Sequence, residues 1–73
     1  MSAVVKRSVT VRGHRTSFSV EQPFFDELRA IAAERALPLA ALVAEIDAER
    51  PRETNLSSAI RLHVLAAVKA RQG

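Results

Sequence analysis

Hydrophobic and polar residues alternate at period two in one segment near the start of the chain, and helical spacing follows directly after it. Val9 and Val11 are odd-numbered whereas Phe18 and Val20 are even-numbered, so the phase of the alternation changes near the first glycine. A two-residue turn at Gly13-His14, with glycine at positive φ in the first central position of a type II′ turn, accounts for this change. The segment is therefore predicted to form a β-hairpin over about residues 6–21.

This turn fixes a register in which Val11 faces Thr16, Arg12 faces Arg15 and Lys6 faces Glu21. One face is then apolar, with Val9, Val11, Phe18 and Val20. The other face has cations and hydroxyls, with Ser8, Thr10, Arg12, Arg15, Ser17 and Ser19. Because two arginines directly opposite each other destabilise a hairpin, their presence favours an anionic partner for this face.

Two other interpretations fit the same pattern. In the first interpretation, the polar face of the hairpin is solvated and binds no ligand. In the second, residues 15–21 form a lone strand that pairs with its copy from another chain, and residues 1–13 form a basic arm. The pattern by itself leaves these alternatives open.

Hydrophobic residues recur at helical spacing through most of the remaining chain. They predict three helices, at about residues 23–35, 38–49 and 55–70. Pro23 favours the start of the first helix, and Pro38 ends it because the residue before a proline is disfavoured in a helix. Thr54 or Asn55 is expected to cap the third helix. Apolar residues cover most of the circumference of that helix, which predicts burial on more than one side, including against another subunit.

The length of 73 residues predicts a single domain, residues 1–73, with too small a core to be comfortably stable alone. The chain has no cysteine, and His14 and His63 are far apart without metal-ligand spacing, so we expect no disulfide, metal or cofactor. Hydrophobic residues nevertheless reach 48% of the composition. This surplus predicts self-association, at least as a homodimer.

The net charge of +3 is unevenly distributed along the chain. Residues 1–15 have four cations and no acid, whereas residues 21–53 contain all eight acids. A basic pole of this kind is typical of proteins that bind a phosphate backbone, although solubility alone can also explain it. No apolar run approaches the length of a membrane span or of a signal peptide, so we expect a cytoplasmic protein without a membrane partner.

Enzymatic chemistry is not predicted. The sequence does not place a histidine and a carboxylate where they would activate a serine as a nucleophile. Gly13 and Gly73 are the only glycines, which are too few for a phosphate-binding loop. His63 lies among apolar neighbours and is interpreted as a packed neutral histidine.

The stretches KRSVTVRGHRTSFSVE, FFDELRAIAAERALPLAALVAEIDAER and NLSSAIRLHVL resemble the ribbon-helix-helix superfamily of the Arc and MetJ repressors, within a subgroup of short bacterial proteins. The resemblance spans about residues 6–68. It implies a mostly α-helical fold with an N-terminal β-ribbon and, here, an additional C-terminal helix. It also implies an intertwined homodimer in which strands of two subunits pair antiparallel and the ribbon lies in the major groove of double-stranded DNA.

The resemblance further implies that alternate outward side chains of the strand reach base edges, which are Ser17, Ser19 and Glu21 here. Long Arg, Lys, Asn or Gln side chains are usual at these positions, and serine discriminates bases weakly. Members of the superfamily also bind a phosphate at the start of the second helix, where residues 36–40 of this chain lack a hydroxyl. The segment Asn55-Leu56-Ser57-Ser58 has better chemistry for an anion, and helix capping explains it equally well.

The sequence therefore predicts a small dimeric DNA-binding protein and transcriptional regulator. The residues expected to contact phosphates are Lys6, Arg7, Arg12, His14 and Arg15, and those expected near bases are Thr16, Ser17 and Ser19. The residues expected in the dimer interface are Phe18, Val20, Leu42, Ile46, Ile60 and Val64. The alternative is a protein-interaction or oligomerisation module that retains the fold without specific DNA binding and uses Glu21 and the acidic helices. An antitoxin role is less favoured, because such proteins usually have a long tail after the last helix.

Overall fold

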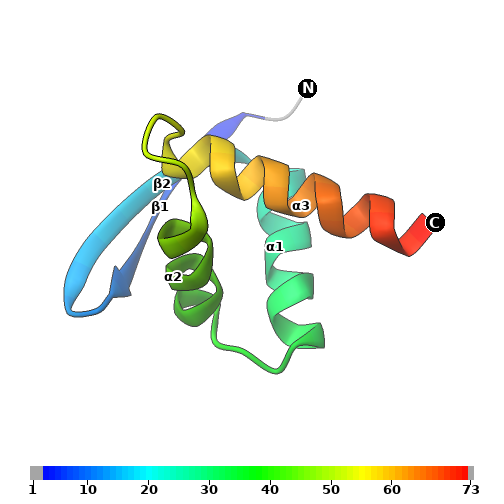
Figure 1. The fold of residues 1–73 in the computed structure, drawn as a ribbon, viewed down its shortest axis with the longest axis horizontal. Coiled ribbons are helices and arrows are strands. Elements are labelled where there is room, and N and C mark those ends of the chain that lie inside the picture. The colour runs from blue at the N-terminus through cyan, green and yellow to red at the C-terminus, as the bar shows by residue number, and fades with distance from the viewer. Residues whose placement is uncertain (1–2, 73) are drawn as a thin grey trace.

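Two β-strands and then three α-helices follow one another in the computed structural model, which describes residues 3–72. The strands β1 (Val4–Val11) and β2 (His14–Glu21) pair antiparallel as a hairpin. The helices are α1 (Gln22–Glu34), α2 (Leu39–Glu49) and α3 (Leu56–Gln72). Figure 1 shows α1 and α2 side by side on one side of α3, with the hairpin beyond α2 and its turn projecting away from the helices. The predicted ribbon followed by three helices is confirmed.

The turn of the hairpin is Arg12-Gly13, one residue earlier than predicted, because Val11 pairs with His14. Arg12 and Gly13 have φ values of 51° and 82°, and positive φ at both central residues defines a type I′ turn. Turns of this type have the backbone twist that matches the right-handed twist of the flanking strands. Glycine has no Cβ and adopts the second of these conformations at little cost.

The predicted cross-strand pairs are therefore wrong. Arg15 lies opposite Thr10 rather than Arg12, and Lys6 lies opposite Ser19 rather than Glu21. The alternative with a lone second strand and a free basic arm is also not the observed arrangement, since β1 and β2 pair along their full lengths.

The two faces of the hairpin are nevertheless those that the alternation predicts. Val11, Phe18 and Val20 are buried, and Val9 is half-buried against the same core. Every partner moved by two positions between the predicted and the observed register, and side chains two positions apart in a strand lie on the same face. The prediction of which face each side chain occupies is therefore correct, although the predicted turn is one residue too late.

Helix α1 ends in a Schellman motif before Pro38 is reached. The N–H of Leu37 donates to the Ala32 carbonyl at 2.8 Å, and the N–H of Ala36 donates to the Ala33 carbonyl at 3.1 Å. Ala36 has a φ of 56°, the left-handed conformation that this motif requires and that glycine usually supplies. The motif reverses the chain so that α2 can pack beside α1.

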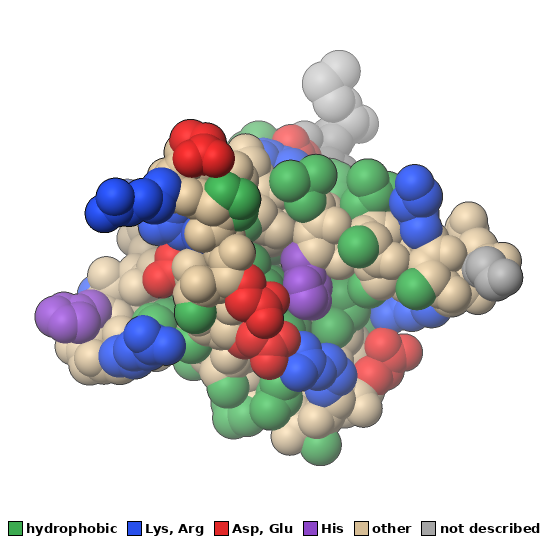
Figure 2. Space-filling model, in the orientation of Figure 1, with side chains coloured by type: hydrophobic (Ala, Val, Ile, Leu, Met, Phe, Trp, Pro, Cys, Tyr) green, Lys and Arg blue, Asp and Glu red, His purple; other side chains and the backbone are tan. Residues whose placement is uncertain are grey.

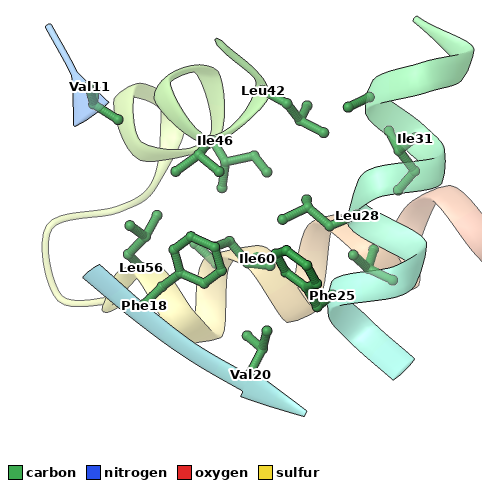
Figure 3. Close-up of a cluster of buried hydrophobic side chains, with 14 residues drawn as sticks. Val11, Phe18, Val20, Phe25, Leu28, Ile31, Leu42, Ile46, Leu56 and Ile60 are labelled. Carbon is green, nitrogen blue, oxygen red and sulfur yellow. The ribbon is translucent and has the colours of Figure 1, made fainter. Parts of the chain in front are cut away.

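Fourteen buried hydrophobic side chains from all five elements form one core. Figure 3 shows Phe18 of β2 and Phe25 of α1 meeting near Ile60 of α3, with a distance of 6.4 Å between the ring centroids. Leu28 and Leu42 are fully buried between the helices. The helices and the inner face of the hairpin are thus parts of a single packed unit.

The six residues predicted to form the dimer interface all lie inside this core, at 4% exposure or less. They are Phe18, Val20, Leu42, Ile46, Ile60 and Val64. The single chain already covers them, so they do not form a surface that a second copy can contact in this arrangement. Within the single chain, helix α3 is buried on one side, and Leu62 and Leu65 remain 61% and 51% exposed, so burial of its other side against another subunit stays a prediction.

Candidate nucleic-acid interface

The hairpin turns one polar face away from the helices, and we call it the outer face. Its residues are Lys6, Ser8 and Thr10 of β1 and Arg15, Ser17 and Ser19 of β2. All of them are exposed except Ser19, which is half-buried. The hydroxyls of Ser8 and Ser17 lie 3.3 Å apart across the strands. The chain thus presents a complete two-stranded ribbon with polar side chains, the shape that the major groove of B-DNA admits.

The turn adds further positive charge at the free end of the hairpin. Arg12, Gly13 and His14 are exposed there, and Arg15 follows directly on the outer face. Figure 2 shows basic and histidine side chains at the end of the molecule where Figure 1 places this turn. The helices therefore do not prevent the protruding end of the ribbon from contacting an anionic surface.

The inner face of the hairpin holds three residues that the sequence prediction grouped with the others: Arg7, Thr16 and His14, of which His14 lies opposite Val11 and is exposed beside the turn. The Arg7 guanidinium stacks on the Phe25 ring at 4.0 Å, and its Nη2 donates to Gln22 Oε1 at 2.8 Å. Thr16 lies opposite Val9 and is half-buried. The register places all three on the side opposite the outer face, and the contacts of Arg7 attach β1 to α1.

Helix α3 contacts the end of the ribbon that lies farthest from the turn. The Ser19 N–H donates to Ser57 Oγ at 2.8 Å, and Arg61 Nη2 donates to the Ser19 carbonyl at 3.4 Å. Arg61 Nε also donates to Glu21 Oε1 at 2.9 Å. Sequence reasoning missed Arg61, because it lies 40 residues from Glu21 and no local pattern links the two.

Glu21 is the acid at the end of the outer face. The hydrogen bond from Arg61, helped by the backbone N–H of Glu21 itself, lowers the pKa of this carboxyl despite partial desolvation. The carboxylate is therefore ionised at neutral pH and has a cation beside it. Glu21 therefore repels a neighbouring anion less than an unpaired carboxylate would.

The two helix starts considered as anion sites differ in the structure. Pro38 precedes α2 and provides no side-chain cap. At α3, Asn55 Oδ1 accepts the Ser58 N–H at 2.8 Å, while the Ser57 hydroxyl accepts the Ser19 N–H. Asn55 thus caps α3 as the capping interpretation predicts, and the Ser57 hydroxyl in its first turn has a partner in β2.

The described residues were also searched for a metal site, a ligand cavity and a membrane-spanning helix. Over residues 3–72, no group of three or more His, Cys, Asp or Glu side chains is arranged to hold a metal ion. His63 is half-buried and lines a shallow hollow of about 280 Å³ between the end of α2 and α3. None of the described helices has the length and apolar character needed to cross a membrane.

Most of the chain, from the ribbon into α3, matches one protein family. The family model described as a ribbon-helix-helix domain matches residues 4–68, from the start of β1 to well into α3. The chain belongs to the ribbon-helix-helix family. Ribbon-helix-helix domains typically are DNA-binding transcription regulators, and the fold is a non-enzymatic one. Neither the search of curated proteins nor that of solved structures found a match.

Proposed function

We propose that this ribbon-helix-helix domain binds double-stranded DNA through the outer face and turn of its hairpin and acts in the cytoplasm as a transcriptional regulator. The observation that supports this most is the exposed ribbon, on which every ionisable side chain from Lys6 to Arg15 is basic or histidine. Lys6, Arg12, His14 and Arg15 are the proposed phosphate contacts. Arg7 and Thr16 of the sequence-based set are left out, because they face the helices.

The side chains near the bases have short hydroxyls. Ser8, Thr10 and Ser17 are exposed in the middle of the outer face and are the proposed groove contacts, with Ser19 beside them. Hydroxyls donate to or accept from any base edge and discriminate weakly between bases. We therefore expect phosphate contacts to supply most of the affinity, with a modest preference for sequence.

Titration of random-sequence duplex DNA at several salt concentrations tests the proposal. Affinity should fall steeply with salt, because each neutralised phosphate releases counterions. Arg15→Ala should lower the slope of log affinity against log salt by about one unit. Lys69→Ala, an equal loss of charge at the far end of α3, should leave the slope unchanged. A wild-type affinity that is absent or insensitive to salt would overturn the proposal.

A second candidate is a protein-interaction face on α3, for which Leu62 and Leu65 are the favouring observation. A hollow of about 240 Å³ adjoins Leu65, and its lining of Phe24, Val64 and Val68 is almost wholly apolar. Ribbon-helix-helix domains usually act as dimers, and we propose a homodimer for this chain. A dimer that keeps this fold would use surfaces such as the α3 face and the outer edge of β1.

Sedimentation of the wild type and of Leu65→Asp tests this candidate. A dimer joined through α3 should dissociate in the variant while the helical circular dichroism is retained, because Leu65 is half-exposed in the single chain. Persistence of the dimer in Leu65→Asp would exclude the α3 face as the site of association. A wild-type monomer at micromolar concentration would exclude the homodimer itself.

A further inference from the structure

Helix α3 covers one point on the free edge of β2. In a two-residue hairpin the residues that flank the turn exchange hydrogen bonds, and hydrogen-bonded pairs alternate with non-bonded pairs along the strands. Val11 and His14 flank this turn, so Ser19, opposite Lys6, directs its N–H and carbonyl away from β1. Both of these groups are bonded to α3, through Ser57 and Arg61.

We propose that Ser57 and Arg61 are positioning residues that hold the ribbon on the helices in the orientation it needs to bind DNA. This inference rests on the proposed function. An isolated two-stranded hairpin is only marginally stable in water. Here the hairpin also projects its basic turn beyond the helices, so the orientation of the outer face depends on how the hairpin is attached, through its apolar inner face and through the bonds of Ser19.

The attachment to α3 fixes the direction of β2. The Ser57 hydroxyl and the Arg61 guanidinium bond to both backbone groups of one residue, Ser19, so β2 cannot rotate about its own axis without breaking one of these bonds. Rotation of the strand would turn Ser17 and Arg15 relative to the helices. A fixed orientation lets several phosphate contacts form together, without an ordering cost when DNA binds.

Arg61 has a second effect, through charge. Its Nε donates to Glu21 at 2.9 Å, and both side chains are about one-third exposed at the end of the ribbon. Loss of Arg61 would leave an unpaired carboxylate beside the proposed DNA surface. The experiment must therefore separate the positioning effect from the charge effect.

Four substitutions make this separation. Ser57→Ala removes one bond to Ser19 without any change of charge. Arg61→Gln removes the guanidinium, and the double variant Glu21→Gln with Arg61→Gln restores the charge balance but not the bonds to Ser19. Lys69→Gln is the matched control, because it removes an equal charge from the same helix away from the ribbon.

Each variant is titrated with the same random-sequence duplex at several salt concentrations, below its melting temperature and with its helix content verified by circular dichroism. We expect Arg61→Gln to weaken binding about tenfold and to lower the salt slope by about one unit, since fewer phosphates are contacted at once. Ser57→Ala should lower the slope in the same direction and should accelerate hydrogen exchange at the Ser19 amide. The double variant should recover only part of the affinity, and Lys69→Gln should match the wild type.

A merely structural role would change the melting temperature and leave the salt slope of the folded protein at the wild-type value. If wild-type binding is salt-dependent but Ser57→Ala and Arg61→Gln keep its slope, this inference is overturned and the proposed function stands. Full recovery in the double variant would show that charge alone acts, which also overturns the positioning role. If Arg61→Gln does not fold, Ser57→Ala alone decides, through the salt slope of DNA binding and hydrogen exchange at the Ser19 amide. A wild type that does not bind DNA overturns the proposed function instead.

Discussion

Arg12 is the residue with the least favourable backbone conformation in the proposed interface. Its φ of 51° lies in the left-handed region, which costs an L-residue other than Asn or Asp about 1 kcal/mol. Asparagine is the usual residue for this half of a type I′ turn, particularly before glycine. Under the proposed function, a cation at this position favours binding at the expense of turn stability.

Arg12→Asn should consequently raise the free energy of unfolding by about 1 kcal/mol and lower the salt slope of DNA binding by about one unit. Thermal melts and duplex titrations measure the two effects. Arg15→Asn is the matched control, because it removes a charge from a strand position with no positive φ, so the salt slope should fall and the free energy of unfolding should not rise, since asparagine is disfavoured in strands. Equal stability changes in the two variants would contradict the type I′ assignment.

Glu21 and Glu45 give the stability of the chain an expected dependence on pH. The hydrogen bond from Arg61 lowers the pKa of Glu21, and that from Arg35 lowers the pKa of Glu45, each from an ordinary value of 4.5. A carboxyl whose pKa is lower in the folded than in the unfolded state stabilises the fold above the unfolded value, and this contribution disappears as pH falls through the folded value. The midpoint of urea unfolding should therefore decrease on acidification below pH 4.5.

Glu21→Gln should reduce that decrease, because glutamine does not titrate. Urea titrations from about pH 6 to about pH 3 measure it. Glu53→Gln, an exposed change in the loop before α3, is the control and should retain the wild-type dependence. A Glu21→Gln profile parallel to the wild type would show that the bond with Arg61 does not contribute to stability in solution.

At the scale of the elements, the end of α1 has a residue that the Schellman motif does not favour. Ala36 has a φ of 56° where glycine is common, so Ala36→Gly should stabilise the chain by about 1 kcal/mol. Ala33→Gly, within the same helix, should instead destabilise it by about 1 kcal/mol. Urea unfolding measures both changes. A loss of stability in Ala36→Gly would contradict the left-handed conformation at the end of α1.

At the scale of the whole molecule, one core joins the hairpin to all three helices, so disruption from α3 should unfold the ribbon as well. Ile60 is completely buried, and Ile60→Asp places an unpaired charge there, which should unfold the chain. Leu65→Asp, five positions along the same helix and half-exposed, should leave the fold intact. Circular dichroism reports the helices, and amide exchange in β2 reports the ribbon. Protected β2 amides in Ile60→Asp would show that the hairpin is stable on its own.

Much of the candidate site follows from alternation along the chain. Period two placed Arg15, Ser17 and Ser19 opposite in face to Phe18 and Val20, and the structure agrees. The same rule applied to Arg7, which has the parity of Val9 and Val11, already indicates the inner face that the structure shows. The exact turn did not follow, because the two registers give identical faces, so the alternation does not distinguish a turn at Gly13-His14 from one at Arg12-Gly13.

The sequence by itself determined the two faces of the ribbon, the three helices and the basic charge of the ribbon, since each depends on residues close together in the chain. Only the tertiary structure decided what covers each apolar stripe within the chain, and it buries Ile60 and Val64 in the core that the hairpin and the helices share. It also decided the contact of Arg61 with Glu21 and Ser19. Both depend on how whole elements pack against one another. Hydrophobic burial is non-directional, so an apolar stripe does not specify its partner, and the bond between Arg61 and Glu21 joins residues that are 40 positions apart in the chain.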